Sequence, residues 1–312
     1  MKALTYHAGQ RAVQDEAQTR GVADKLADWV GPVADFARGA DLVVLAAPEQ
    51  GGGLRFAVVS GAAPFVRIAD EAALHLELPA GLADHVPTPS AVGGLVISLG
   101  LARRARVNGL LYRRNGATEL ATSEAFTLCR KYLAPSVAVS DAPVRIGPAA
   151  RESLPLDHPR IADVLARAET SFLASISPEG MPDVAHRGGA PGFLAYDAAA
   201  RTLAWSEFVG DGVFKSAGNV RATGTMALLV PDLASGDGAV LFGRAEYVTD
   251  AGQRAQREDA LVQHREEFPP QGRMTCTIAR AERLSGLAHP RERIARAPRV
   301  TSRSTVPEQK PR

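Results

Sequence analysis

The segment of the sequence best suited to bind an anionic ligand runs from Asp183 to Phe193 and reads DVAHRGGAPGF. The guanidinium fork of an arginine such as Arg187 can pair with two phosphate oxygens at once. Gly188 and Gly189 follow it, and adjacent glycines let a backbone approach a ligand closely and present its N–H groups. The competing interpretation is a tight turn between two strands.

A second segment, Gly210 to Asn219, reads GDGVFKSAGN and supplies a lysine, a hydroxyl and an amide within one expected loop. With the first segment, Lys215, Ser216 and Asn219 predict a phosphate cradle beside a surface for a polar ring system. Neither segment contains the GxxxxGK[ST] of a P-loop. The sequence also lacks a dinucleotide-binding fingerprint, and its succession of strands disfavours a doubly wound fold.

The titratable residues near these segments leave alternatives open. The imidazole of His186 suits proton transfer, or it belongs to a strand residue that faces away from the ligand. Asp211 either touches the edge of a ligand ring or caps a turn. Cys129, beside Lys131, is either a reactive thiolate or a buried residue at a strand end. Cys129 and Cys276 have no metal-ligand spacing and the seven histidines form no spaced cluster, so we expect no metal site.

The chain has 312 residues, of which 46% are hydrophobic and 22% charged, as is typical of a soluble protein with one large or two ordinary domains. A formal net charge of +2 does not by itself indicate nucleic-acid binding. No segment has the about 18 consecutive apolar residues of a membrane span, and the N-terminus lacks a signal-peptide layout. We therefore expect a cytoplasmic protein without a membrane or nucleic-acid partner. The alanine- and arginine-rich composition suggests a GC-rich bacterial genome.

The first half of the chain reads as two helices followed by strands. Apolar residues at helical spacing predict one amphipathic helix over residues 11–30, and a short second helix is expected over 32–38. Asn115-Gly116 is a strong hairpin signal. Strands are predicted at 42–47, 55–60, 73–78, 94–99, 105–111 and 117–127.

The second half repeats this order. A helix is predicted over 158–169 with Asp157 as its N-cap. Strands are predicted at 171–176, 184–187, 193–197, 202–205, 225–230 and 239–249. The string SGAAPF at 60–65 resembles RGGAPGF at 187–193, which indicates a duplicated β-rich domain.

The repeat defines the expected domain boundaries. The two domains are predicted at residues 1–139 and 157–288, joined by a Pro- and Ala-rich linker at 140–156. Residues 289–312 are rich in arginine and poor in large apolar residues, which predicts a disordered basic tail.

These strings carry a family resemblance. GMPDVAHRGGAPGF, preceded by TSFLAS at 170–175 and followed by LAW at 203–205 and KSAGN at 215–219, resembles the FMN-binding split-barrel proteins of the pyridoxamine 5′-phosphate oxidase-like superfamily. The stretches YHAG at 6–9, RRARVNG at 103–109 and CRKYL at 129–133 resemble the front domain of larger, tandem-barrel members. The resemblance covers roughly residues 3 to 250.

The resemblance implies a mainly β protein built from tandem split β-barrels with flanking helices, in which FMN lies between two barrels, usually across a dimer interface. It implies phosphate contacts from Arg187, Lys215 and Ser216, and backbone contacts from Gly188 and its neighbours. It also implies an aromatic wall near the flavin ring. The full set of cofactor-binding residues expected in this way is His186, Arg187, Gly188, Gly189, Trp205, Phe208, Asp211, Lys215, Ser216 and Asn219.

The chain departs from the family pattern in two places. It reads Gly210-Asp211-Gly212 where relatives commonly show Gly-Asn, which puts the ring-edge contact in question. In the first copy, Ser60 stands in the place of Arg187, and Asp84 lies where a phosphate would be repelled. We therefore expect a degenerate first barrel that acts as a scaffold and closes the pocket of the second.

The resemblance favours an FMN-dependent oxidoreductase that moves a hydride or electrons to or from a small organic substrate through flavin N5. With no Rossmann domain, NAD(P)H would bind transiently or a partner reductase would deliver the electrons. The alternatives are the same fold holding deazaflavin or haem, and a non-catalytic binding or sensing module that holds a flavin or nothing. Self-association into a homodimer is also expected from the family. The substrate is not indicated.

Overall fold

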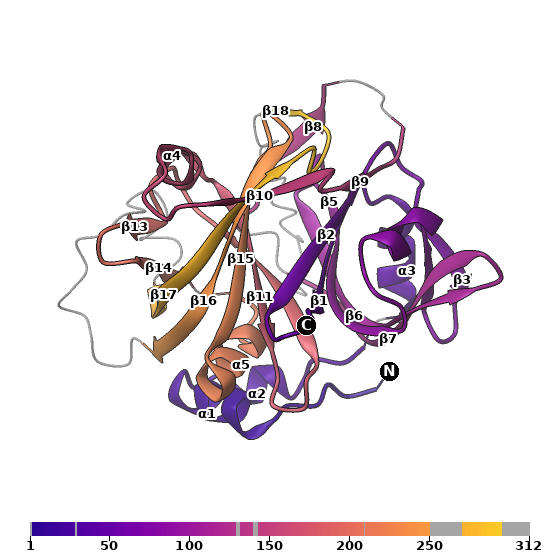
Figure 1. The fold of residues 1–312 in the computed structure, drawn as a ribbon. Coiled ribbons are helices and arrows are strands. Elements are labelled where there is room, and N and C mark those ends of the chain that lie inside the picture. Colours follow the sequence, from indigo (N-terminus) through magenta and orange to yellow (C-terminus); the bar gives the residue numbers. More distant parts are fainter. Residues whose placement is uncertain are drawn as a thin grey trace, which may run out of the picture.

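The computed structural model describes residues 2–28, 30–128, 132–139, 143–208, 210–249 and 270–294. Two curled sheets stand side by side, with a few short helices around them (Figure 1). Every strand pairing given below is antiparallel. The mainly β fold with two split barrels and flanking helices, expected from the sequence, is confirmed.

The first sheet, here called the first barrel, is built from hairpins. Asn115 and Gly116 have φ of 50° and 80°, so both residues of the β6–β7 turn are left-handed as a tight hairpin requires. Helix α3 (Val30–Arg38) packs on this sheet and shares its apolar core. The strand order is β3 (Arg67–Asp70), β4 (His75–Leu78), β7 (Ala117–Thr127), β6 (Arg103–Arg114), β5 (Ser90–Ser98), β1 (Leu42–Pro48), β2 (Leu54–Ser60) and β9 (Arg145–Gly147).

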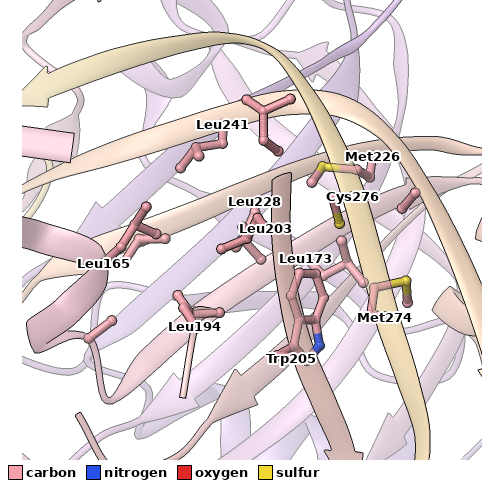
Figure 2. Packing of buried hydrophobic residues seen from close by; sticks show 14 of the residues in the cluster. Leu165, Leu173, Leu194, Leu203, Trp205, Met226, Leu228, Leu241, Met274 and Cys276 are labelled. Carbon is pink, nitrogen blue, oxygen red and sulfur yellow. The ribbon is translucent and has the colours of Figure 1, made fainter. Parts of the chain in front are cut away.

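The second sheet, the second barrel, is organised around one long strand. β17 (Pro270–Ser285) pairs with β16, β14 and β10. Helix α4 (Pro159–Arg167) packs against the core of this barrel, which includes Trp205, Met274 and Cys276 (Figure 2). The strand order is β12 (Pro182–Gly188), β11 (Thr170–Ile176), β15 (Thr225–Asp232), β16 (Asp237–Thr249), β17, β14 (Thr202–Phe208) and β13 (Ala195–Asp197), with β10 (Ala150–Leu154) on β17.

The N-terminal helices lie on the second barrel, although the sequence assigned them to the first domain (Figure 1). The single helix predicted over 11–30 was wrong. Gln18 has a φ of 58° and breaks it, so the structure has α1 (Ala8–Glu16) and α2 (Arg20–Ala23). α1 packs against α5 (Lys215–Thr223), where Gly9 and Gly218 let the two backbones approach closely.

Two local predictions in the second half also require correction. The expected loop over 210–219 becomes helix α5 from Lys215 onward, because Phe214 turns the chain with a φ of 52° immediately before it. α4 is capped by His158 and not by Asp157, since the Nδ1 atom of His158 accepts the backbone N–H of Arg160 at 3.2 Å.

The predicted linker and tail contribute to the sheets. Within 140–156, β9 pairs with β2 and β10 pairs with β17, so these residues join both barrels. β18 (Arg291–Arg293) pairs with β8 (Ser136–Ala138), and residues 289–294 are therefore not part of a disordered tail. Arg291 is buried, and its guanidinium is paired there, because it donates to Asp41 at 2.8 Å and to the backbone carbonyl of Ser136. Residues 295–312 lie outside the described residues.

The two barrels meet through a shared apolar core. It combines side chains of β1, β2 and β5 with side chains of β11, β15 and β16, and Phe56 and Phe172 are its largest fully buried members. Gly93 of β5 sits against the backbone of Asp183 on β12, where a Cβ atom would lie 2.6 Å from the Asp183 Cα. No helix among the described residues is long and apolar enough to cross a membrane.

Candidate functional site

A pocket lies between the barrels, beside the first turn of α5. The second barrel contributes the end of β12, the end of β14 and residues 210–217, and the first barrel contributes β6 and residues 128 and 132. The pocket brings together eight of the predicted cofactor-binding residues: His186, Arg187, Gly188, Trp205, Phe208, Asp211, Lys215 and Ser216.

Two predicted residues lie outside this pocket. Asn219 is 1% exposed and holds α1 in place, because its Oδ1 accepts from Gln10 at 2.9 Å and lies 2.8 Å from His7 Nε2. Its Nδ2 donates to Ser175 Oγ at 3.1 Å. The backbone N–H of Gly189 donates to the carbonyl of Glu169. Both residues therefore have structural partners instead of a position on the pocket wall.

Arg187 is fixed by three neighbours. Its Nε donates to Glu207 Oε1 at 2.6 Å, and its Nη1 donates to the backbone carbonyl of His186 at 3.0 Å. Its Nη2 donates to Ser216 Oγ at 3.3 Å and so points toward the beginning of α5. One edge of the guanidinium is therefore used by a carboxylate, and another faces the first turn of the helix.

The first turn of α5 adds backbone donors to the same wall. The helix has nine residues, and its N-cap Phe214 makes no side-chain cap hydrogen bond. The first N–H groups of a helix have no partner inside it and carry the positive end of its dipole. Together with Arg187 Nη2 and Ser216 Oγ, these N–H groups form a wall that attracts an anion.

Lys215 points elsewhere, toward the first barrel. Its Nζ donates to Glu124 Oε1 at 2.5 Å and to the carbonyl of Thr5 at 3.2 Å, and it lies 5.1 Å from the centre of the Tyr6 ring. Burial, and next the charge of Glu124, raise the pKa of Tyr6 to about 12. The ammonium group therefore serves an ion pair between the barrels, although Lys215 also lines the pocket.

His186 is the unusual residue of the pocket. Only 6% of it is exposed, its ring packs on Phe172 at 5.8 Å, and neither ring nitrogen has a hydrogen-bond partner in the part of the chain that the structure describes. Burial, with the charges of Arg104 and Arg187, holds the pKa of His186 well below its usual value. The imidazole is therefore neutral at pH 7 and carries two unsatisfied polar atoms, which is costly in a buried position.

Trp205 and Phe208, which the resemblance placed near a flavin ring, line the pocket together with Tyr132. Trp205 Nε1 donates to Glu207 Oε1 at 2.8 Å, and the rings of Tyr132 and Phe208 lie 5.7 Å apart. Asp211 lines the pocket and also caps a turn, because its Oδ1 accepts from the Val213 N–H at 3.1 Å.

The sequence analysis missed the residues that the first barrel supplies. Arg104 and Arg106 line the pocket from β6, where alternate side chains face the second barrel. Arg106 Nε lies 3.0 Å from Asp183 Oδ1, and both side chains are almost fully buried. The RRARVNG string at 103–109 carried only a family resemblance in the sequence. The signal for this role was the spacing of Arg104 and Arg106, which places both side chains on the same face of a strand.

A polar network continues from the pocket across the interface. Asn108 Nδ2 lies 3.0 Å from Asp183 Oδ1 and 3.2 Å from Glu124 Oε2, and Glu124 pairs with Lys215. The chain of contacts from Lys215 to Arg106 therefore contains one lysine, one arginine and two carboxylates. Their formal charges cancel.

In the first barrel, the residues that stand in the place of Arg187 and Lys215 contact other parts of the chain. Ser60 Oγ accepts the backbone N–H of His289 at 3.1 Å, and His289 Nε2 lies 2.7 Å from the Pro143 carbonyl. Asp84 pairs with Arg113 at the surface. A serine and an aspartate supply no cation at these two positions.

Of the two cysteines that the sequence offered, the structure describes only Cys276. Cys276 is a buried free thiol, and burial raises its pKa. Cys129 and Lys131 lie outside the described residues. Among the residues that the structure describes, no three His, Cys, Asp or Glu side chains gather in a way that could hold a metal ion.

Comparison with known proteins gives matches to solved structures. No family model and no curated protein matches the chain. HupZ of Group A Streptococcus is 17% identical with a TM-score of 0.31, over 42% of this chain and 96% of that chain. A putative pyridoxamine 5′-phosphate oxidase from Lactobacillus delbrueckii is 20% identical with a TM-score of 0.27, over 36% and 83%. HutZ, the heme storage protein of Vibrio cholerae, is 13% identical with a TM-score of 0.27, over 42% and 96%.

Proposed function

We propose that the interbarrel pocket binds FMN and that the protein is a flavin-dependent oxidoreductase acting on a small organic molecule. One observation carries this proposal. Arg187 Nη2, Ser216 Oγ and the first turn of α5 converge on one wall of a pocket that Trp205 and Phe208 also line. An anion-binding wall beside aromatic side chains suits a ligand with a phosphate and a planar ring.

The residues of the pocket have distinct parts in this proposal. Arg187, Ser216 and the α5 backbone would hold the phosphate, and the aromatic side chains would exclude water from the ring. A bound flavin would supply the hydride and electron transfer. The first barrel would close the pocket through β6, and NAD(P)H or a partner reductase would deliver electrons from outside.

A second candidate has support from His186. A neutral imidazole is an iron ligand in many haem proteins, and His186 lines the pocket with two buried ring nitrogens that have no hydrogen-bond partner among the described residues. The same pocket holding haem is therefore the alternative to FMN. Deazaflavin would use the anion-binding wall in the same manner as FMN.

The visible spectrum of the purified protein, followed by FMN titration, tests the proposal. Flavin bands support the first candidate, and a Soret band supports haem. A protein that has no visible absorption band and does not bind added FMN contradicts both. Arg187→Gln and Ser216→Ala should each weaken FMN binding, Arg187→Gln by at least tenfold, because each removes a donor to the phosphate.

Controls separate loss of the site from loss of the fold. Arg160→Gln on α4 removes an exposed arginine far from the pocket and should bind FMN as the wild type does. Thermal unfolding without FMN should show that both pocket variants fold. Stoichiometric FMN retained by Arg187→Gln would refute the phosphate site.

A further inference from the structure

The pocket contains a carboxylate that the proposed phosphate would have to tolerate. Glu207 lies on β14, lines the pocket and is 9% exposed. Its Oε1 accepts from Arg187 Nε at 2.6 Å and from Trp205 Nε1 at 2.8 Å. The carboxylate is therefore held in one place on the pocket wall by two donors.

Glu207 and the anion-binding wall share one guanidinium. Arg187 donates through Nε to Glu207 and through Nη2 to Ser216, so the carboxylate and a phosphate at Ser216 would lie on two sides of the same arginine. Coulomb repulsion between them falls only with the first power of distance, and burial weakens its screening by water. Lys215 and Arg106, which also line the pocket, do not compensate, since their charges are paired with Glu124 and Asp183.

A separate feature of the same pocket is an unpaired imidazole. His186 lines the pocket, is 6% exposed and has no hydrogen-bond partner for either buried ring nitrogen within the described residues. Buried polar groups in proteins normally have a partner, so this imidazole calls for one, such as a water molecule or a ligand.

We propose that Glu207 determines the charge of the anionic group that this pocket accepts. By neutralising Arg187, it makes the wall favour a singly charged group, such as a phosphodiester, over a doubly charged phosphate monoester. This inference rests on the proposed function for its ligand class, and it concerns specificity instead of the reaction.

The test compares three probes at pH 7.5. Riboflavin has no negative charge, the methyl phosphodiester of FMN has one, and FMN has about two. Glu207→Gln keeps an oxygen that accepts from Arg187 and Trp205, but it removes the charge. FMN affinity should rise at least tenfold in this variant, the diester affinity about threefold, and the riboflavin affinity less than twofold. Glu246→Gln, an exposed carboxylate on β16, is the charge-matched control and should change none of them.

The wild type alone gives a second measurement that does not depend on the variant's folding. It should bind the diester at least as tightly as FMN. The inference is wrong if the wild type binds FMN more tightly than the diester. It is also wrong if a folded Glu207→Gln variant binds FMN no more tightly than the wild type does. Either result leaves the flavin proposal intact.

Inorganic phosphate, followed by tryptophan fluorescence, separates the two proposals further. If no flavin binds but Glu207→Gln binds phosphate more tightly than the wild type, the flavin proposal fails and the role of Glu207 stands. If neither flavins nor phosphate bind to any form, both are wrong.

Discussion

At the scale of single residues, the pocket is defined by the partners that its charged groups have. Arg187 has Glu207, Lys215 has Glu124, and the neutral His186 has no partner among the residues that the structure describes. Ion pairs of this kind restore part of the solvation that burial removes. The unpaired imidazole is the exception, and its protonation is therefore a direct readout of the environment of the pocket.

The neutral state of His186 makes the free energy of unfolding depend on pH. Its pKa is low in the folded protein and near 6.5 in the unfolded chain, so below pH 6.5 only the unfolded chain takes up the proton. The stability is fully present above pH 6.5 and declines as the pH falls, by about 1.4 kcal/mol per pH unit until the folded pKa is reached.

Between pH 7.5 and pH 5.5, the free energy of unfolding should fall less in His186→Leu than in the wild type, and the difference between the two falls should be about 1.4 kcal/mol. Urea unfolding at the two pH values measures this difference. His85→Leu, which removes a partly exposed histidine of the first barrel, is the matched control. Parallel pH profiles for the wild type and His186→Leu would show that His186 does not remain neutral.

At the scale of elements, the crossing of α1 and α5 holds the first turn of α5 in its place. The two helices are separated by more than 200 positions in sequence, and glycines allow their close approach. A Cβ atom on Gly218 would lie 2.4 Å from the Cα of Gln10. Gln14 reinforces the crossing, because its Nε2 donates to the carbonyl of Val213 at 2.8 Å.

Gly218→Ala should lower the free energy of unfolding by about 2 kcal/mol, because the added methyl forces α1 away from α5. Gly21→Ala is the matched control, since nothing lies within 4 Å of its added methyl and alanine favours a helix. Chemical denaturation measures both variants. An unchanged free energy of unfolding for Gly218→Ala would show that α1 and α5 do not pack closely at Gly218.

At the scale of the whole molecule, the two barrels form a single folded unit. They share the apolar core around Phe56 and Phe172, and the network from Lys215 to Arg106 spans the same interface. β18 adds another tie, since the end of the described chain returns to pair with β8. One barrel cannot unfold without exposing the apolar face of the other.

The protein should therefore unfold in one cooperative transition, and Phe172→Ala should lower the free energy of unfolding by about 3–4 kcal/mol. Circular dichroism and tryptophan fluorescence should give the same midpoint in denaturant. Leu110→Ala, at a 48% exposed position, should have little effect. Two separated transitions would show that the barrels fold independently.

Features of the fold that depend on neighbouring residues were predictable from the sequence, whereas features that depend on distant partners were not. The β6–β7 hairpin was predictable because the Asn115-Gly116 turn and the alternation of its strands are local. The single helix over 11–30 was wrong because tertiary packing of α1 on α5, and a left-handed Gln18, outweigh the apolar spacing. β17 was missed altogether, although its 16 residues alternate buried and exposed positions. Its partners β14 and β10 are distant in sequence, so no local turn indicated the pairing.

The sequence by itself determined the duplicated β-rich fold and the presence of Arg187 and Ser216 near a glycine-rich turn, because residue types and spacing carry this information. Only the tertiary structure decided which carboxylate each cation meets, that Lys215 turns toward Glu124, and that β6 completes the pocket. The physical reason is that a charge interacts with whatever the fold brings within a few ångströms, and pairs such as Glu124 and Lys215 lie far apart along the chain.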